Sequence, residues 1–191
     1  AAAIFARLLA EKNGDTISTA ANTKFADIPA HAWYSGYVKY LSNNGITYGK
    51  SKTVFAPNDA ITRAEFTALA VRFFDVYGDG DAEIMEQFSG FNDVSSGYWA
   101  AEYIKYAALH GWINGYGDGS FHAEREINRA EVVTIVNRLL DREADESYIA
   151  DNLRKLNTFP DVSRKHWAYY AVMEAANAHT AVLGESESWS K

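Results

Sequence analysis

Two arginines in this chain stand where the chemistry of a helix start predicts a bound anion. Arg63 and Arg129 lie in the segments ITRAE (61–65) and INRAE (127–131), which have the spacing of a capping box at a helix N-terminus. A cation there costs roughly 0.3 to 1 kcal/mol against the macrodipole, so an anion should compensate. A carboxylate ligand held by the guanidinium and by free backbone N–H groups would do so. The alternative is an internal ion pair, for which the candidate carboxylates are Asp27, Asp93, Glu65 and Glu131.

Tryptophans and glycines recur near these arginines and form a second set of candidate ligand contacts. Trp33, Trp99 and Trp167 open amphipathic segments on their apolar side. Core packing is the first expectation for them, although an indole edge in a groove would stack on a sugar ring. Gly45 and Gly111 end two of these segments. They are expected to cap helices at a positive φ, and they are also candidates for ligand contact.

Catalytic and metal chemistry find little support in the same sequence. Asp93 and Glu131 are of the type that serves glycoside hydrolysis, but each has a counterpart 66 residues earlier, which favours a scaffold role. The chain has no G-x-S-x-G elbow, phosphate loop, HExxH or cysteine. Asp118 and the run 78–81 resemble calcium loops without the full set of oxygen ligands, and the five histidines show no zinc spacing. We therefore expect neither an enzyme nor a bound cofactor or metal.

A nine-residue signature occurs three times, as FADIPAHAW at 25–33, FNDVSSGYW at 91–99 and FPDVSRKHW at 159–167. The first two copies stay in register at an offset of 66 residues over 25–75 and 91–141, where 15 of 51 paired positions are identical. About three identities would be expected by chance. The chain is therefore built from repeats, each too short to cover its own apolar face.

Each complete repeat is expected to consist of a helix, a glycine-rich loop and a second helix. Apolar residues at i, i+4, i+7 and i+8 predict a first helix from Trp33 and from Trp99. The capping boxes predict a second helix that runs to about residue 74 or 140. The acidic stretches at about 76–90 and 142–158 are expected to be connections between lobes.

The two ends of the chain match complementary halves of a repeat. Residues 1–14 correspond to a second half, and residues 159–183 to a first half in which His179 replaces the glycine. Together they would complete a third unit, so that three quasi-equivalent helix-loop-helix units close into a ring. This model predicts an all-α fold in which a helix at 2–11 packs beside a helix at about 166–178.

Composition limits the domain number, the partners and the compartment. The 191 residues are 48% hydrophobic, enough to bury a core, and the repeats favour one domain over residues 1–191. A net charge of −7 without a Lys/Arg run opposes binding to nucleic acid or to an anionic membrane. No apolar stretch reaches the roughly 18 to 20 residues of a membrane span. The absence of cysteine excludes disulfides and leaves the compartment open.

Three motifs recur in these repeats: the F-x-D-V-x-x-x-x-W-A opening at 91–100 and 159–168, the G-[IW]-I-x-G-Y-x-D-G-x-F loop at 111–121 and the ITRAE helix start at 61–65. Together they resemble the S-layer homology domain of bacterial cell-surface proteins. This resemblance implies three repeats in a pseudo-threefold trefoil around a central helical bundle. It also implies a secreted, cell-surface module, monomeric in isolation, that anchors a protein non-covalently to a secondary cell-wall polysaccharide, often pyruvylated.

The resemblance further implies that the helix-start arginines line grooves between lobes. This points to Arg63 and Arg129 only, because the third unit lacks that motif. The full predicted ligand site adds the tryptophans and helix-end glycines of the two complete repeats, which are Trp33, Trp99, Gly45 and Gly111. Since the third unit has also lost the glycine-led loop, we expect at most two strong glycan sites. The alternative function is a structural module that binds a protein partner in surface-layer assembly.

Overall fold

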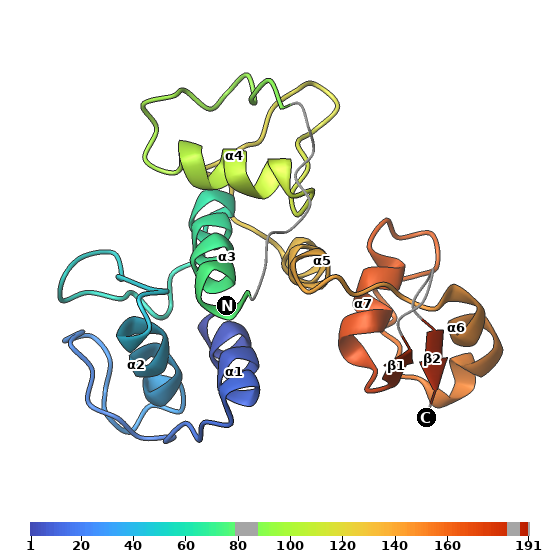
Figure 1. Cartoon of the computed structure of the whole chain (residues 1–191), viewed down its shortest axis with the longest axis horizontal. Helices are drawn as coiled ribbons and strands as arrows, with labels where there is room; N and C mark the ends of the chain where they lie inside the picture. The colour runs from blue at the N-terminus through green and yellow to red at the C-terminus, as the bar shows by residue number, and fades with distance from the viewer. Residues whose placement is uncertain (79–87, 183–187, 191) are drawn as a thin grey trace.

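The computed structural model describes residues 1–78, 88–182 and 188–190, and there the chain is all-α apart from one short hairpin (Figure 1). The helices are α1 (Ala2–Asn13), α2 (Ser35–Asn43), α3 (Arg63–Tyr77), α4 (Ala101–Leu109), α5 (Arg129–Leu139), α6 (Glu146–Asn152) and α7 (Tyr169–Ala176), with a 3₁₀ turn η1 (Leu153–Lys155) after α6. Strands β1 (Thr180–Val182) and β2 (Ser188–Ser190) pair antiparallel. The predicted all-α class is confirmed, whereas the hairpin was not expected.

The second helix of each complete repeat begins at the capping box that its sequence predicts. The Thr62 hydroxyl accepts from the Glu65 N–H at 3.1 Å, and a Glu65 carboxylate oxygen accepts from the Thr62 N–H at 3.0 Å. Asn128 and Glu131 repeat both bonds at the start of α5. These reciprocal bonds satisfy N–H groups that a helix start leaves without an intrahelical partner. They also fix the residue that follows the cap, an arginine in both repeats, at the first helical position.

The aspartate of the repeated signature holds the loop that leads into the second helix. Asp93 accepts from the N–H groups of Phe121 and His122, both at 2.7 Å, and Asp27 makes the equivalent bonds in the preceding repeat. Burial raises the pKa of Asp93, but the two backbone hydrogen bonds outweigh it, and the net shift of this pKa is downward. Both aspartates are therefore occupied by the scaffold, and Asp93 is not free for acid–base catalysis.

Six of the described helices pack in three pairs, and each pair joins the second helix of one repeat to the first helix of the next. α1 packs on α2, α3 on α4 and α5 on α7, while α3 also packs on α1 and α5 (Figure 1). A polar contact marks the first two pairs in the same way. Arg7 of α1 donates to the Tyr37 hydroxyl at 3.2 Å, and Arg72 of α3 donates to the Tyr103 hydroxyl at 3.1 Å.

The predicted packing of the N-terminal helix against the helix at 166–178 is wrong. α1 lies against α2 and α3, whereas α7 lies against α5, which stands between them in Figure 1. The first helix of the next repeat, α2, follows α1 directly in the chain and offers the same kind of apolar face as α7, so neighbours in sequence pair. The closed-ring model fails with this contact. The trefoil arrangement and the single domain over residues 1–191 stay predictions.

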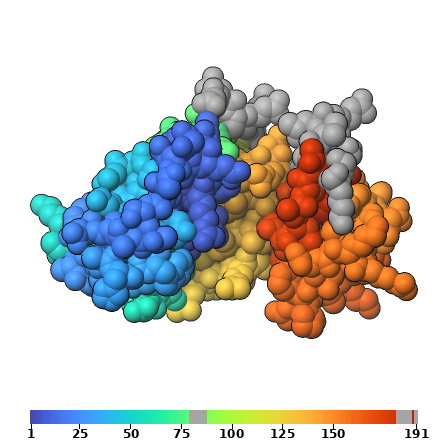
Figure 2. Space-filling view, turned by 90° about the horizontal axis from the view of Figure 1, so that it is seen from below, coloured from blue at the N-terminus to red at the C-terminus, as the bar shows by residue number. Residues whose placement is uncertain are grey.

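The main core lies where the second helices of the repeats meet. Phe5 of α1 is fully buried against Phe66 and Phe73 of α3, with ring centroids 5.5 and 4.7 Å apart. A separate cluster in the C-terminal part includes Met173 of α7 and Trp189 of β2. Figure 2 shows this part, in orange and red, as a distinct bulge beside the rest of the molecule.

The C-terminal hairpin takes the place of the glycine-led loop in the third lobe. His179 stacks on Trp189 with ring centroids 4.0 Å apart. The Trp189 N–H donates to the Asp145 carboxylate at 3.1 Å, and the same carboxylate caps α6 by accepting from the Tyr148 N–H at 2.7 Å. The stretch 142–158, expected to be a connection between lobes with a short helical pattern at Ile149, Leu153 and Leu156, contributes α6 to this lobe.

Candidate ligand grooves along α3 and α5

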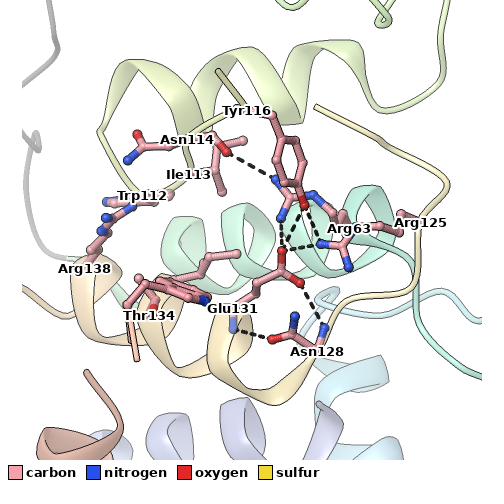
Figure 3. Close-up of a pocket in the computed structure, with 13 residues that line it drawn as sticks. Arg63, Trp112, Ile113, Asn114, Tyr116, Arg125, Asn128, Glu131, Thr134 and Arg138 are labelled. Atoms are coloured by element: carbon pink, nitrogen blue, oxygen red, sulfur yellow. Dashed lines mark hydrogen bonds and ion pairs between the residues drawn. The ribbon is translucent and has the colours of Figure 1, made fainter. Parts of the chain in front are cut away.

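In the described part of the chain, two grooves of similar construction lie along the second helices of the complete repeats. Groove A follows α3 and groove B follows α5, with volumes of about 610 and 500 Å³, within the usual range of small-molecule sites. Each is bounded by the preceding loop, the start of the second helix and a tryptophan of the following lobe. Groove A is lined by residues that include Trp33, Tyr48, Lys50, Asp59, Glu65, Arg72 and Trp99. Groove B is lined by residues that include Arg63, Asn114, Tyr116, Arg125, Glu131, Arg138 and Trp167 (Figure 3).

Glu131 is the shared acceptor in groove B (Figure 3). Its Oε1 accepts from Nη1 of Arg63 at 2.7 Å, from Nη2 of Arg125, and from the Tyr116 hydroxyl at 3.3 Å. Its Oε2 accepts from the Asn128 N–H at 3.0 Å. Glu131 is therefore a capping residue and an ion-pair partner at once, which leaves it unsuited to act as a general base with Asp93.

Arg63 reaches from α3 into the following repeat and is buried, with 5% of its surface exposed. Its Nε donates to the Phe121 carbonyl oxygen at 2.8 Å and its Nη2 to the Asn114 carbonyl oxygen at 3.2 Å. The guanidinium also lies over the Phe121 ring, 4.4 Å from the centroid. For this arginine the structure shows the internal ion pair, and the partner is Glu131. Arg63 is nevertheless part of the groove B wall.

Arg129 differs from Arg63 although the two occupy equivalent positions in the repeat. It is exposed and lines neither groove, and its side chain forms no hydrogen bond or ion pair with another described residue. Arg63 finds its partners in the loop and helix of the next repeat, but the third lobe has a hairpin after His179 in place of that loop. A ligand role for Arg129 stays a prediction.

The repeated tryptophans are exposed, so the first expectation of core packing is wrong. Trp33, Trp99 and Trp167 are 66%, 53% and 65% exposed. The first two line groove A and the third lines groove B. The reason is local, because α2, α4 and α7 begin two residues after their tryptophans, which places each indole on a turn outside the apolar helix face. An exposed indole in a groove is suited to stacking on a sugar ring.

The two predicted site glycines cap helices and line neither groove. Gly45 and Gly111 follow α2 and α4 with φ of 73° and 68°, which confirms the capping prediction. Gly49 and Gly115, four residues further on, do line the grooves. A Cβ on Gly115 would lie 2.4 Å from Cε1 of Phe91, so only glycine allows the groove loop to pack there.

The site prediction missed an arginine that lines each groove at equivalent positions, Arg72 in groove A and Arg138 in groove B. Arg7, Arg72 and Arg138 recur at one position of the repeat, and this recurrence was the signal that could have found them. The Arg72 guanidinium lies over the rings of Tyr103 and Tyr48, 4.6 and 4.8 Å from the centroids.

The calcium and membrane expectations can be compared with the described residues. No group of three or more His, Cys, Asp or Glu side chains among them could hold a metal ion. Asp118 accepts from the N–H and the hydroxyl of Ser120 at 3.0 and 2.6 Å, and these bonds lower the pKa of Asp118. The calcium-loop candidate 78–81 lies outside the described residues except for Gly78. No described helix is long and apolar enough to cross a bilayer.

The fold and the grooves define a helical repeat protein whose grooves combine exposed indoles with cationic side chains, which is the form of a binding module. Residues 24–67 and 90–133 match the family model of the S-layer homology domain. The chain belongs to this family.

Several curated relatives align with most of the chain. It is 31% identical over 195 residues to Cell surface glycoprotein 1 of Acetivibrio thermocellus, covering 98% of the chain and 8% of that protein. It is 29% identical over 188 residues to the Cellulosome-anchoring protein of the same organism, covering 97% of the chain and 39% of that protein. It is 27% identical over 117 residues to S-layer protein EA1 of Bacillus anthracis, covering 61% and 13%. The chain thus spans less than half the length of each of these relatives.

Proposed function

We propose that the chain is an anchoring module that holds a bacterial surface protein to the cell wall by non-covalent binding of a secondary cell-wall polysaccharide. The S-layer homology repeats support this role, and so do relatives named for the cell surface, cellulosome anchoring and the S-layer. They also support a location at the cell surface and a binding role in place of catalysis. The observation that carries the proposal is the pair of grooves in which exposed tryptophans stand beside cationic side chains.

The chemistry of these grooves suits an acidic polysaccharide. Indoles such as Trp99 and Trp167 offer flat apolar faces to sugar rings, and guanidinium groups bind carboxylates, including that of a pyruvyl ketal, through charge-assisted hydrogen bonds. Because the chain carries a net charge of −7, long-range attraction does not favour an anionic polymer. Binding must depend on local cations, for which Arg63 in the groove B wall and the exposed Arg129 are predicted contributors.

A pull-down with purified cell wall tests the proposal. The chain should be retained by wall that carries its polysaccharide and lost from wall stripped of it. The double variant Trp99→Ala/Trp167→Ala should bind at least about tenfold more weakly, a loss of about 1.4 kcal/mol. Phe159→Ala is the matched control, because Phe159 is 44% exposed and lines neither groove. Equal retention by stripped wall would contradict polysaccharide binding, and retention only by a purified surface-layer protein would favour the protein-partner alternative.

A further inference from the structure

Groove B contains a cation that no described residue neutralises. Among the described residues that line it there are three arginines, Arg63, Arg125 and Arg138, and one carboxylate, Glu131. This carboxylate is already shared by Arg63 and Arg125. Arg138 is exposed and has no carboxylate partner among the described residues.

The polar neighbour of Arg138 in the groove wall is neutral. With its amide nitrogen donating to the Ile113 carbonyl oxygen at 3.0 Å, the Asn114 side chain places its oxygen 3.3 Å from Nη1 of Arg138. One amide acceptor engages one of the five N–H groups of a guanidinium and none of its charge. Among the described residues, none uses the charge of Arg138 or its remaining N–H donors, and these are left for a ligand.

The charged side chains that line groove A balance one another, although this groove occupies the equivalent place in the repeat. Lys50 forms an ion pair with Glu65, and Asp59 stands at the position that Arg125 takes in groove B. Arg72 is held by a tyrosine hydroxyl and lies over two tyrosine rings. Both cationic side chains in the described lining of groove A are thus engaged within the protein.

One change in the repeat pattern accounts for the difference between Arg72 and Arg138. In the first two helix pairs this arginine, Arg7 or Arg72, donates to a tyrosine four residues after the repeated tryptophan. In the third pair that position is Ala171. α7 still packs on α5, and a hydrogen bond from Nδ2 of Asn137 to the Ala171 carbonyl oxygen, 2.9 Å long, joins the two helices. The third pair therefore keeps the helix packing and loses the tyrosine that occupies the arginine in the other two.

We propose that groove B is the site for a carboxylate-bearing saccharide, that Arg138 is its anion contact, and that groove A receives uncharged sugar. A guanidinium presents a planar pair of donors that matches a carboxylate. Trp167 in the same groove offers a face for the ring that carries this carboxylate. The inference rests on the proposed binding of wall polysaccharide and assigns different parts of the polymer to the two grooves.

The indole N–H signals in a nuclear magnetic resonance spectrum locate the ligand, because Trp167 reports on groove B and Trp33 and Trp99 report on groove A. The probes are a pyruvylated disaccharide and the same disaccharide without the pyruvyl group. During titration, the pyruvylated probe should shift the Trp167 signal at lower concentration than the Trp33 and Trp99 signals. The probe without the pyruvyl group should not shift the Trp167 signal before the other two. Saturation of the Trp33 and Trp99 signals before that of Trp167 would overturn the assignment.

Two variants test Arg138 itself. Arg138→Gln should weaken binding of the pyruvylated disaccharide about 10- to 100-fold, the range expected for hydrogen bonds to a charged group, and should leave the uncharged probe unaffected. Arg72→Gln is the matched control in groove A and should change the affinity for the pyruvylated probe by less than about twofold. Ala171→Tyr restores the tyrosine that bonds to the equivalent arginine in the other two pairs. This variant should therefore weaken binding of the pyruvylated probe although Arg138 is unchanged.

The outcomes separate this inference from the proposed function. If wild type binds wall polymer while Arg138→Gln and Ala171→Tyr, folded by circular dichroism, bind the pyruvylated probe as tightly as wild type, the inference is wrong and the anchoring role stands. If wild type binds neither the polymer nor either probe, both fail.

Discussion

Replacement of Arg63 by alanine should destabilise the fold far more than replacement of Arg129, its counterpart in the repeat. Arg63 is 5% exposed and joins α3 to two carbonyl oxygens and to the Glu131 carboxylate of the following repeat. Alanine would leave these acceptors without their donor. Arg129 is exposed and makes no such bond with a described residue. The helix macrodipole alone would predict the opposite effect, a small gain in stability when the cation at the helix start is removed.

The magnitude follows from the loss of one partner of a buried ion pair, which costs about 3 to 5 kcal/mol. Arg125 still bonds to Glu131 in the variant, so the carboxylate keeps a cation and the lower end, about 3 kcal/mol, is expected. At about 2 to 4 °C per kcal/mol for a domain of this size, Arg63→Ala should melt about 6 to 12 °C below wild type. Arg129→Ala should stay within about 0.5 kcal/mol of wild type, as exposed substitutions usually do.

Urea unfolding and calorimetry of the two variants measure this difference. A double-mutant cycle with Glu131→Gln isolates the pairwise energy between Arg63 and Glu131. Equal melting temperatures for Arg63→Ala and Arg129→Ala would refute the reasoning, and so would a coupling energy near zero.

Three further outcomes are expected. Phe5→Ala should cost about 3 to 5 kcal/mol and lower hydrogen-exchange protection in α1 and α3 more than in α7, because Phe5 packs on α3 and α7 packs on α5; equal loss in α7 would contradict the helix pairing. The pKa of Asp93 lies below its ordinary value of 3.8, so its contribution to stability is present above that pH and is lost as the pH falls through the folded pKa. Asp93→Asn should therefore melt below wild type at neutral pH, with the gap closing in acid, and a gap independent of pH would count against the bonds to the loop. Burial and the hydrogen bond to Glu124 raise the pKa of Tyr98 to about 12. Ultraviolet titration should therefore show a tyrosine that titrates near pH 12 and that titrates earlier in the Glu124→Gln variant, and an unchanged titration curve for this variant would count against the assignment.

The features that the sequence predicted correctly depend on residues close together in the chain. The capping boxes that start at Thr62 and Asn128 involve positions three residues apart, and both form as expected. The positive φ of Gly45 and Gly111 follows from the need to end a helix within one or two residues. Such hydrogen bonds and backbone conformations are local, so a single sequence is enough to place them.

The partner of the N-terminal helix could not be chosen in the same way. A second-half helix such as α1 has an apolar face that fits either α2 or α7, since both are first helices of a repeat. The register of the repeats was therefore compatible with two arrangements, a closed ring in which α1 packs on α7 and a series of pairs in which α1 packs on α2. Only the tertiary structure shows that α1 packs on α2, because this choice depends on the length of the connection and on which faces remain to be covered.

By itself, the sequence determined the repeat, the capped starts of the second helices, the glycines that end the first helices, the all-α class and the family, because these depend on residue types at fixed local spacing. The tertiary structure alone decided that Arg63 pairs with Glu131, 68 residues away, out of four possible carboxylates. It also decided that the repeated tryptophans face grooves and that Arg138 lacks the partner its counterparts have. Burial, distance and the sharing of a charge arise only when segments far apart in the chain are brought together.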